Sequence, residues 1–249
     1  MSPLSIALVI FACVSAGAAL GIWLQKVLPT HHLSKDSKDL VMVATGLIAT
    51  MAALVLGLLI ASAKASFDAQ DTEIAQVSAD IVTLHRVMVA YGPETKAARD
   101  LLREAVTGMI AKGWSLEGSQ SSPSDPAAEA GRVLDKLATL SPQNPTQRIL
   151  LEEAVRANAS FSRTRWMLAE QSSAIPRPFV VLLVLWIAII FGSFGLFAPD
   201  NTTVFVTLLM CSLSVSGAIF LILELDRPFE GLIQVSPGPL IRALATLGS

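Results

Sequence analysis

The chain has little charge and no strong excess of either sign. Only 15% of its 249 residues are charged, whereas soluble domains carry about 25%. The net charge is −2, which argues against nucleic acid as a partner. Two cysteines are present, Cys13 and Cys211, and both fall inside apolar runs. Small buried thiols are therefore expected there, not a disulfide or a metal site.

The sequence also lacks the patterns that usually accompany catalysis. It contains no glycine-rich phosphate loop after a strand, no nucleophile elbow and no histidine–carboxylate–nucleophile set. His31 and His32 are adjacent in a polar loop, a spacing that does not suit a tetrahedral metal site. His85 is expected on the surface of a helix. We therefore expect that the protein is not an enzyme and binds no cofactor and no metal.

What the chain has in abundance is apolar sequence. It is 53% hydrophobic, with a mean hydropathy of +0.60. Because roughly 20 apolar residues cross a hydrocarbon core of about 30 Å, four runs are long enough to span a membrane: 4–24, 40–63, 179–198 and 202–223. Run 4–24 has no preceding Lys or Arg and is too long for a signal-peptide core, so we expect it to be a retained span. No strand pattern appears, and the predicted fold class is an all-α integral membrane protein.

The four runs predict a domain order. Residues 1–63 hold the first two spans, 64–177 a cytoplasmic helical domain, 178–224 the last two spans and 225–249 a cytoplasmic motif with a short amphipathic tail. Lys and Arg near the span ends favour cytoplasmic termini, together with a cytoplasmic 64–177 domain. Only residues 199–201 separate the last two spans, which predicts a tight antiparallel hairpin.

Residues 64–177 predict a bundle of helices. Apolar residues recur at helical spacing from Phe67 to Tyr91, and no breaker separates them from the second span, so 40–91 is predicted as one helix. Gly92–Pro93 should end it. Further helices are predicted over 94–112, from Pro126 onward and from Pro145 to about 172, the last capped by Asn144. The long helices 66–91 and 145–172 are expected to pair antiparallel, and the polar loop 115–126 to be flexible.

Small residues fall on one face of the second span. They follow one another at spacings of four, three, four and four, and a basic residue continues the face: Gly46, Thr50, Ala53, Gly57, Ala61 and Lys64. Such a face lets helix backbones approach closely. Plain helix packing is one interpretation. The other is a narrow conduit in an oligomer, where a ring of Lys64 side chains would favour anions.

Charge meets an apolar run at the end of the fourth span. Glu224 and Asp226 lie where the helix dipole disfavours negative charge, so they need partners. The motif continues through Arg227, Pro228, Phe229 and Gly231. A paired interfacial network and a ligand or ion site are both open interpretations. Beyond it, apolar residues from Leu240 to Leu247 predict a short amphipathic helix lying on the membrane.

The layout of two spans, a helical insert and two further spans, with Leu-Glu-Leu-Asp-Arg-Pro-Phe-Glu-Gly followed by Val-Ser-Pro, resembles the bacterial bestrophin-like domain family. The resemblance covers essentially the whole chain, and 223–237 is its most specific part. Bestrophins are pentameric anion channels with cytosolic termini and a pore lined by the second span. Their Pro-Phe motif continues into an acidic, calcium-binding cluster. Here residues 230–233 read Glu-Gly-Leu-Ile instead, which puts a calcium site in doubt.

The functional expectation is a homo-oligomeric, anion-permeable channel in a bacterial inner (plasma) membrane, with the second span around the pore. The resemblance implies a pentamer, with the lipid bilayer and a small anion as partners. The alternative is a non-conducting membrane scaffold or sensor whose cytoplasmic domain binds a protein. The four spans contain no charged residue, so the sequence gives no sign of an ion-coupled carrier.

Overall fold

The computed structural model describes residues 2–29, 35–114, 126–170, 175, 177–199, 201–229 and 231–248. In these ranges the regular structure is entirely helical, as the sequence predicts. The expectations for His31, His32 and the loop 115–125 lie outside the described residues. The chain divides into two compact units, Met1–Ser66 with Ser173–Arg227 and Phe67–Ser172 with Pro228–Ser249.

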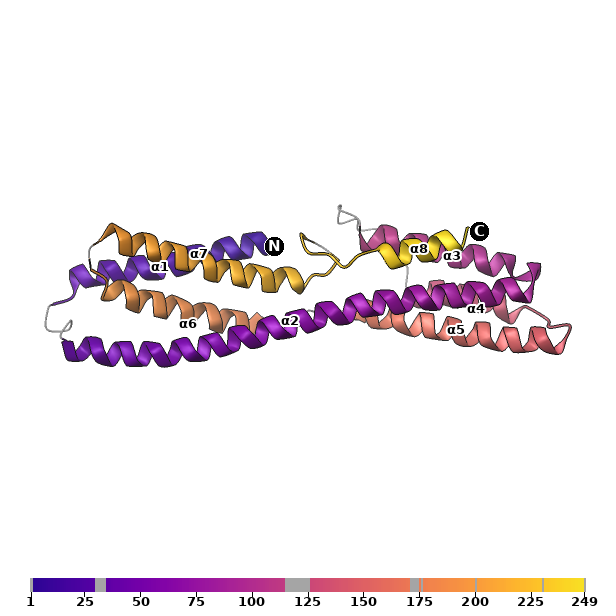
Figure 1. The fold of residues 1–249 in the computed structure, drawn as a ribbon, viewed down its shortest axis with the longest axis horizontal. Coiled ribbons are helices and arrows are strands. Elements are labelled where there is room, and N and C mark those ends of the chain that lie inside the picture. Colours follow the sequence, from indigo (N-terminus) through magenta and orange to yellow (C-terminus); the bar gives the residue numbers. More distant parts are fainter. Residues whose placement is uncertain are drawn as a thin grey trace. The chain divides into compact units, whose positions relative to one another are not determined.

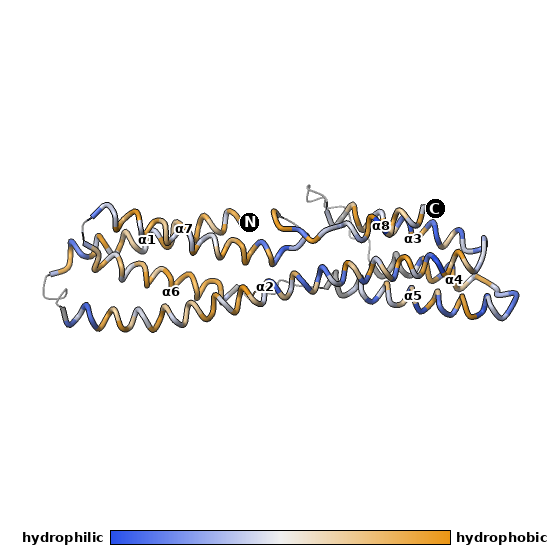
Figure 2. Tube along the Cα trace, in the orientation of Figure 1, coloured by the Kyte–Doolittle hydropathy of each residue, from blue (hydrophilic) through white to orange (hydrophobic). Residues whose placement is uncertain are grey.

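Within the described ranges, four helices are long and apolar enough to cross a membrane, which confirms the prediction of four spans. They are α1 (Pro3–Val27), α2 (Lys35–Tyr91), α6 (Arg177–Leu196) and α7 (Thr202–Leu225). Apolar residues dominate α1, α6 and α7 throughout, whereas α2 becomes more polar in its second half (Figure 2). The chain is therefore a membrane protein by the length and composition of these helices.

Local chemistry sets several helix ends. The Asn201 side chain accepts a hydrogen bond from the backbone nitrogen of Thr203 at 3.1 Å and so caps α7. Helix α2 is continuous to Tyr91 and stops at Gly92, whose φ of 135° suits glycine alone. A 3₁₀ turn (Pro93–Thr95) then leads into α3 (Lys96–Gly113). The predicted continuous helix and its stop at Gly92–Pro93 are confirmed.

The second unit contains the end of α2, α3, α4 (Pro126–Ala138), α5 (Pro145–Glu170) and α8 (Gly238–Thr246) (Figure 1). Two hydrogen bonds show that α2 and α5 run antiparallel. Ser160 donates to Asp80 at 2.8 Å, and Gln147 donates to the carbonyl of Tyr91 at 3.2 Å. All five helices contribute buried side chains to one core, among them Val77, Ile81, Leu84, Met88, Leu102, Val106, Val133, Leu137, Phe161 and Leu240.

The first unit groups α1, α6, α7 and the first part of α2. Helix α1 packs against both α6 and α7. The core of the first unit takes side chains from all four helices, among them Ile10, Val14, Ala52, Leu59, Leu183, Ile187, Phe191, Ile219 and Ile222. This unit carries every residue proposed for the small-residue face of the second span, so that face can be compared directly with the packing around it.

Candidate functional site

The tightest helix packing in the first unit joins α1 and α6 through glycine. A Cβ built on Gly17 would lie 2.8 Å from the carbonyl oxygen of Ala188. One built on Gly21 would overlap the carbonyl of Gly192, and one built on Gly195 would overlap the carbonyl of Ala18. The two backbones can approach this closely only because these positions have no side chain. This contact was not predicted from the sequence, although Gly17 and Gly21 form a small-xxx-small pair that signals it.

Hydroxyl groups join α1 to α7. Ser216 donates a hydrogen bond of 2.6 Å to the carbonyl oxygen of Ala7, and the hydroxyl oxygens of Ser15 and Ser212 lie 3.1 Å apart. Ser212 and Ser216 are buried. In a bilayer such side chains hold neighbouring helices together, because hydrocarbon offers them no other partner. These small and hydroxyl residues of α1, α6 and α7 are thus used within the chain.

The small residues of α2 are placed differently. All five, together with Lys64, are exposed within the chain: Gly46, Thr50, Ala53, Gly57, Ala61 and Lys64. A Cβ added at Gly46 or Gly57 would meet no atom within 4 Å. We call this row the open face of α2. At about 3.6 residues per turn its members form one line along the helix.

The opposite side of α2 makes the contacts with the rest of the unit. Thr45, Ala52, Leu59 and Ala63 are buried, and the last three belong to the core of the first unit. Helical geometry puts them roughly across the helix from the open face. The packing of α2 inside its own chain therefore does not explain its row of small residues.

The charged half of the terminal motif lies at the end of α7, which stops at Leu225 with Asp226 as its C-cap. Glu224 is only 3% exposed, Asp226 is half-buried and Arg227 is exposed. None of the three is without an interaction partner. A buried carboxylate at a helix C-terminus is costly unless it is paired, so this arrangement agrees with the paired network that the sequence left as one of two interpretations.

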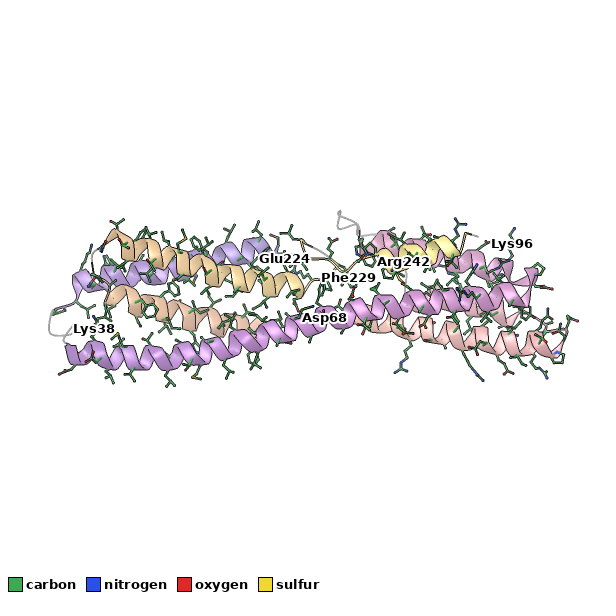
Figure 3. The ribbon with its side chains drawn as sticks, in the orientation of Figure 1. Lys38, Asp68, Lys96, Glu224, Phe229 and Arg242 are labelled. Carbon is green, nitrogen blue, oxygen red and sulfur yellow. The ribbon has the colours of Figure 1, made fainter. Side chains whose placement is uncertain are left out.

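The apolar half of the motif is anchored in the second unit. The rings of Phe229 and Trp114 meet edge to face, with centroids 5.4 Å apart and planes at 87°. The indole nitrogen of Trp114 donates a hydrogen bond of 2.8 Å to the carbonyl of Val235, and the backbone nitrogen of Val235 donates to the carbonyl of Pro228, also at 2.8 Å. Gly231, with φ of 93°, makes the turn between them possible. Figure 3 labels Glu224 and Phe229, one from each half of the motif.

Two expectations for the second unit are wrong. The helix α8 does not offer its apolar face to a membrane, because Leu240, Ala243 and Leu247 are buried in the core of the second unit. His85 is not a surface residue but is buried. Burial, and then the nearby positive charge of Arg99, lower the pKa of His85 below its ordinary value of 6.5. In both cases the helix was predicted, but not the surface that covers it.

Metal-ligand residues do not cluster in the described part of the chain. Within those ranges, no group of three or more His, Cys, Asp or Glu side chains lies close enough to hold a metal ion. Among the described residues, the Nδ1 atom of His85 and the Nε atom of Arg99 are buried and have no hydrogen-bond partner. The two cysteines are exposed on α1 and α7, contrary to the expectation that they are buried.

Comparison with known proteins gives one match. No curated protein and no solved structure matches the chain. The family model named Bestrophin-like domain matches residues 12–240, a range that includes the greater part of α1, the other three apolar helices and the motif after α7. A match over nearly the whole length, together with the helix order found in the structure, shows that the chain belongs to the bestrophin-like domain family.

Proposed function

We propose that the protein is a homo-oligomeric channel, permeable to anions, in which α2 of each copy lines the pore. The observation that carries this proposal is the open face of α2, a row of small residues that the chain's own packing leaves uncovered. Family membership supports the general part of this proposal, a membrane channel, because the bestrophin-like family suggests a channel-type membrane protein. The proposal assigns no enzymatic activity and no cofactor.

Glycine in the middle of α2 needs a physical reason. Gly in a helix interior is less stable than Ala by about 1 kcal/mol, so Gly46 and Gly57 weaken α2 unless their lack of a side chain is useful. Facing lipid tails, they would offer less surface for dispersion contacts than a leucine. Facing other copies of the chain, they permit close approach or leave space for a narrow conduit. The second situation explains the residues, and the first does not.

The charge along the open face favours anions. Residues 40–63 contain no charged side chain, and Lys64 follows on the same face. In a ring of copies, Lys64 would form a collar of positive charge at one mouth of the pore, and such collars attract anions and repel cations. The pentamer implied by the family is the subunit number that we adopt. We place the termini and residues 64–177 on the cytoplasmic side of a bacterial plasma membrane, on the basis of their Lys and Arg distribution.

The alternative is a non-conducting scaffold. A face of small residues also allows helices of several copies to pack tightly without a hole. The second unit has its own core and exposes Ile149 on α5 to 67%, so it has an apolar position available to a protein partner. Conduction separates the two functions, because a solid oligomer carries no current.

The test is electrical recording from purified protein in planar bilayers under a salt gradient. We expect a current whose reversal potential lies near the equilibrium potential of chloride. Lys64→Glu should move the reversal potential toward the equilibrium potential of the cation. In a background of Cys13→Ala and Cys211→Ala, a charged thiol reagent should block Ala53→Cys. The control is Met51→Cys, which lies on the far side of α2 from the open face. Absence of current, or a selectivity that ignores Lys64→Glu, would contradict the proposal.

A further inference from the structure

A cavity of about 320 Å³ lies inside the first unit, between the beginning of α2, the end of α6 and the beginning of α7. Its walls include Thr45 and Ala49 of α2, Phe194 and Phe197 from the α6 end, and Leu208 of α7. Lys38 lines one end, near the start of α2 (Figure 3). The volume falls in the range of about 300–1,000 Å³ that is typical of ligand sites.

The length of the cavity matches one leaflet of a bilayer. Along α2 its lining runs from Lys38 to Ala49, a distance of about 17 Å at 1.5 Å per residue. The hydrocarbon core of a membrane is about 30 Å thick, so the cavity extends over about half of it. It begins where α2 starts, at the end of the span at which lipid headgroups are expected. An acyl chain that enters beside Lys38 could therefore lie along α2 as far as Ala49.

The chemistry of the walls points the same way. Apart from Lys38, the lining is apolar or carries only small hydroxyl groups. The Ser193 hydroxyl already donates to the carbonyl of Ile189 at 3.0 Å. A polar metabolite would thus lose hydration without gaining enough hydrogen bonds, whereas a hydrocarbon chain loses nothing. Lys38 gives the opening a positive charge, and neither Asp36 nor Asp39 lines the cavity to cancel it there.

We propose that this cavity binds an acidic phospholipid from the surrounding bilayer. One acyl chain fills the space between α2, α6 and α7, and the headgroup phosphate pairs with the ammonium group of Lys38. A Lys ammonium group binds phosphate as a point charge. The inference does not depend on conduction, because the cavity belongs to a single chain and Gly46 is the one member of the open face in its lining.

The experiment uses full-length protein in phosphatidylcholine vesicles, titrated with brominated phosphatidylglycerol or brominated phosphatidylcholine as the probe. Met42→Trp puts a fluorescent reporter at the wall of the cavity, and its signal is read as the difference from the parent protein. Leu40→Trp is the control, since Leu40 is exposed near the same depth and does not line the cavity. Each reporter is also combined with Lys38→Gln and, separately, with Ala49→Leu, which fills the deep end.

We expect half-maximal quenching of the Met42→Trp reporter at an about fivefold lower mole fraction of the brominated acidic lipid than of the neutral one, the factor that one such charge contact gives. Lys38→Gln should remove that difference, and Ala49→Leu should weaken the quenching by both lipids. The Leu40→Trp control samples the bulk bilayer, so both brominated lipids should quench it with the same midpoint. Equal midpoints for the two lipids with Lys38 intact would overturn the proposal. So would a cavity reporter that neither lipid quenches, which is the result expected if a second copy of the chain occupies the cavity.

Discussion

The indole nitrogen of Trp114 and the carbonyl oxygen of Val235 are joined by a hydrogen bond of 2.8 Å across 121 residues of sequence. This bond attaches the segment after α7 to the end of α3. Val235 itself is buried, as are Leu240 and Ala243 in the helix that follows. The C-terminal segment is therefore part of the core of the second unit, and the terminal motif changes at Pro228 from a charged helix end to an apolar anchor.

Trp114→Phe should lower the stability of the second unit by about 1–3 kcal/mol, because the carbonyl of Val235 loses its donor while the ring against Phe229 is largely retained. Thermal unfolding of the detergent-solubilised protein, followed by circular dichroism, measures the change. Trp166→Phe is a matched control, since Trp166 is 52% exposed and should show almost no effect. If the two variants unfold alike, the hydrogen bond contributes nothing of note.

Gly21→Ala should destabilise the first unit, because a methyl group there overlaps the carbonyl of Gly192 on α6. Forcing one extra carbon into a packed contact costs about 1–3 kcal/mol. Gly57→Ala adds the same methyl group to open space and should leave the stability of the single chain unchanged or slightly higher. The stabilities of the two variants are compared by unfolding them in mixed micelles with an increasing fraction of denaturing detergent. Equal loss in both variants would mean that α1 and α6 do not make this contact in the membrane.

The number, type and limits of the helices follow from local chemistry, and so they could be predicted from the sequence. The four apolar runs, the cap at Asn201, the stop at Gly92 and the first helical positions of Pro126 and Pro145 each depend on residues close in the chain. The capping pattern at Asn144 is present too, since Asn144 accepts from the backbone nitrogen of Gln147 at 2.8 Å.

The contacts between helices could not be predicted in the same way. A periodic pattern says that a helix has an apolar face, but not which surface covers it. His85 and the apolar face of α8 were misplaced for this reason, and the role of Trp114 left no signal in the sequence. The close contact of Gly21 with Gly192 needed the small-residue rule to be applied to α1 as well as to α2. The pore-lining role of Gly46, Thr50, Ala53, Gly57, Ala61 and Lys64 stays a prediction.

Ser216→Ala should loosen α7 from α1, because it removes the hydrogen bond to the carbonyl of Ala7. Hydrogen bonds between membrane helices contribute about 0.6 kcal/mol on average and up to about 1.7, and this one is short and buried. Ser214→Ala is the control: Ser214 is exposed, and its hydroxyl donates at 3.0 Å to Met210 of its own helix. The same detergent-unfolding assay should show a loss for Ser216→Ala alone. A similar loss in both variants would point to helix propensity instead of the interhelical bond.

Lowering the pH should destabilise the second unit through His85. Burial and the charge of Arg99 depress its pKa in the folded protein below the ordinary value of 6.5, so the unfolded chain binds the proton more readily. The contribution of the neutral side chain is therefore fully present above pH 6.5 and is lost as the pH falls from there through the folded pKa. His85→Leu removes the titrating group, and the difference in unfolding free energy between parent and variant isolates it from the carboxylates. As the pH falls from about 7 to about 5, the unfolding free energy of the parent should decrease relative to that of His85→Leu. A difference that stays constant over this range would show that His85 is as accessible to protons in the folded bundle as in the unfolded chain.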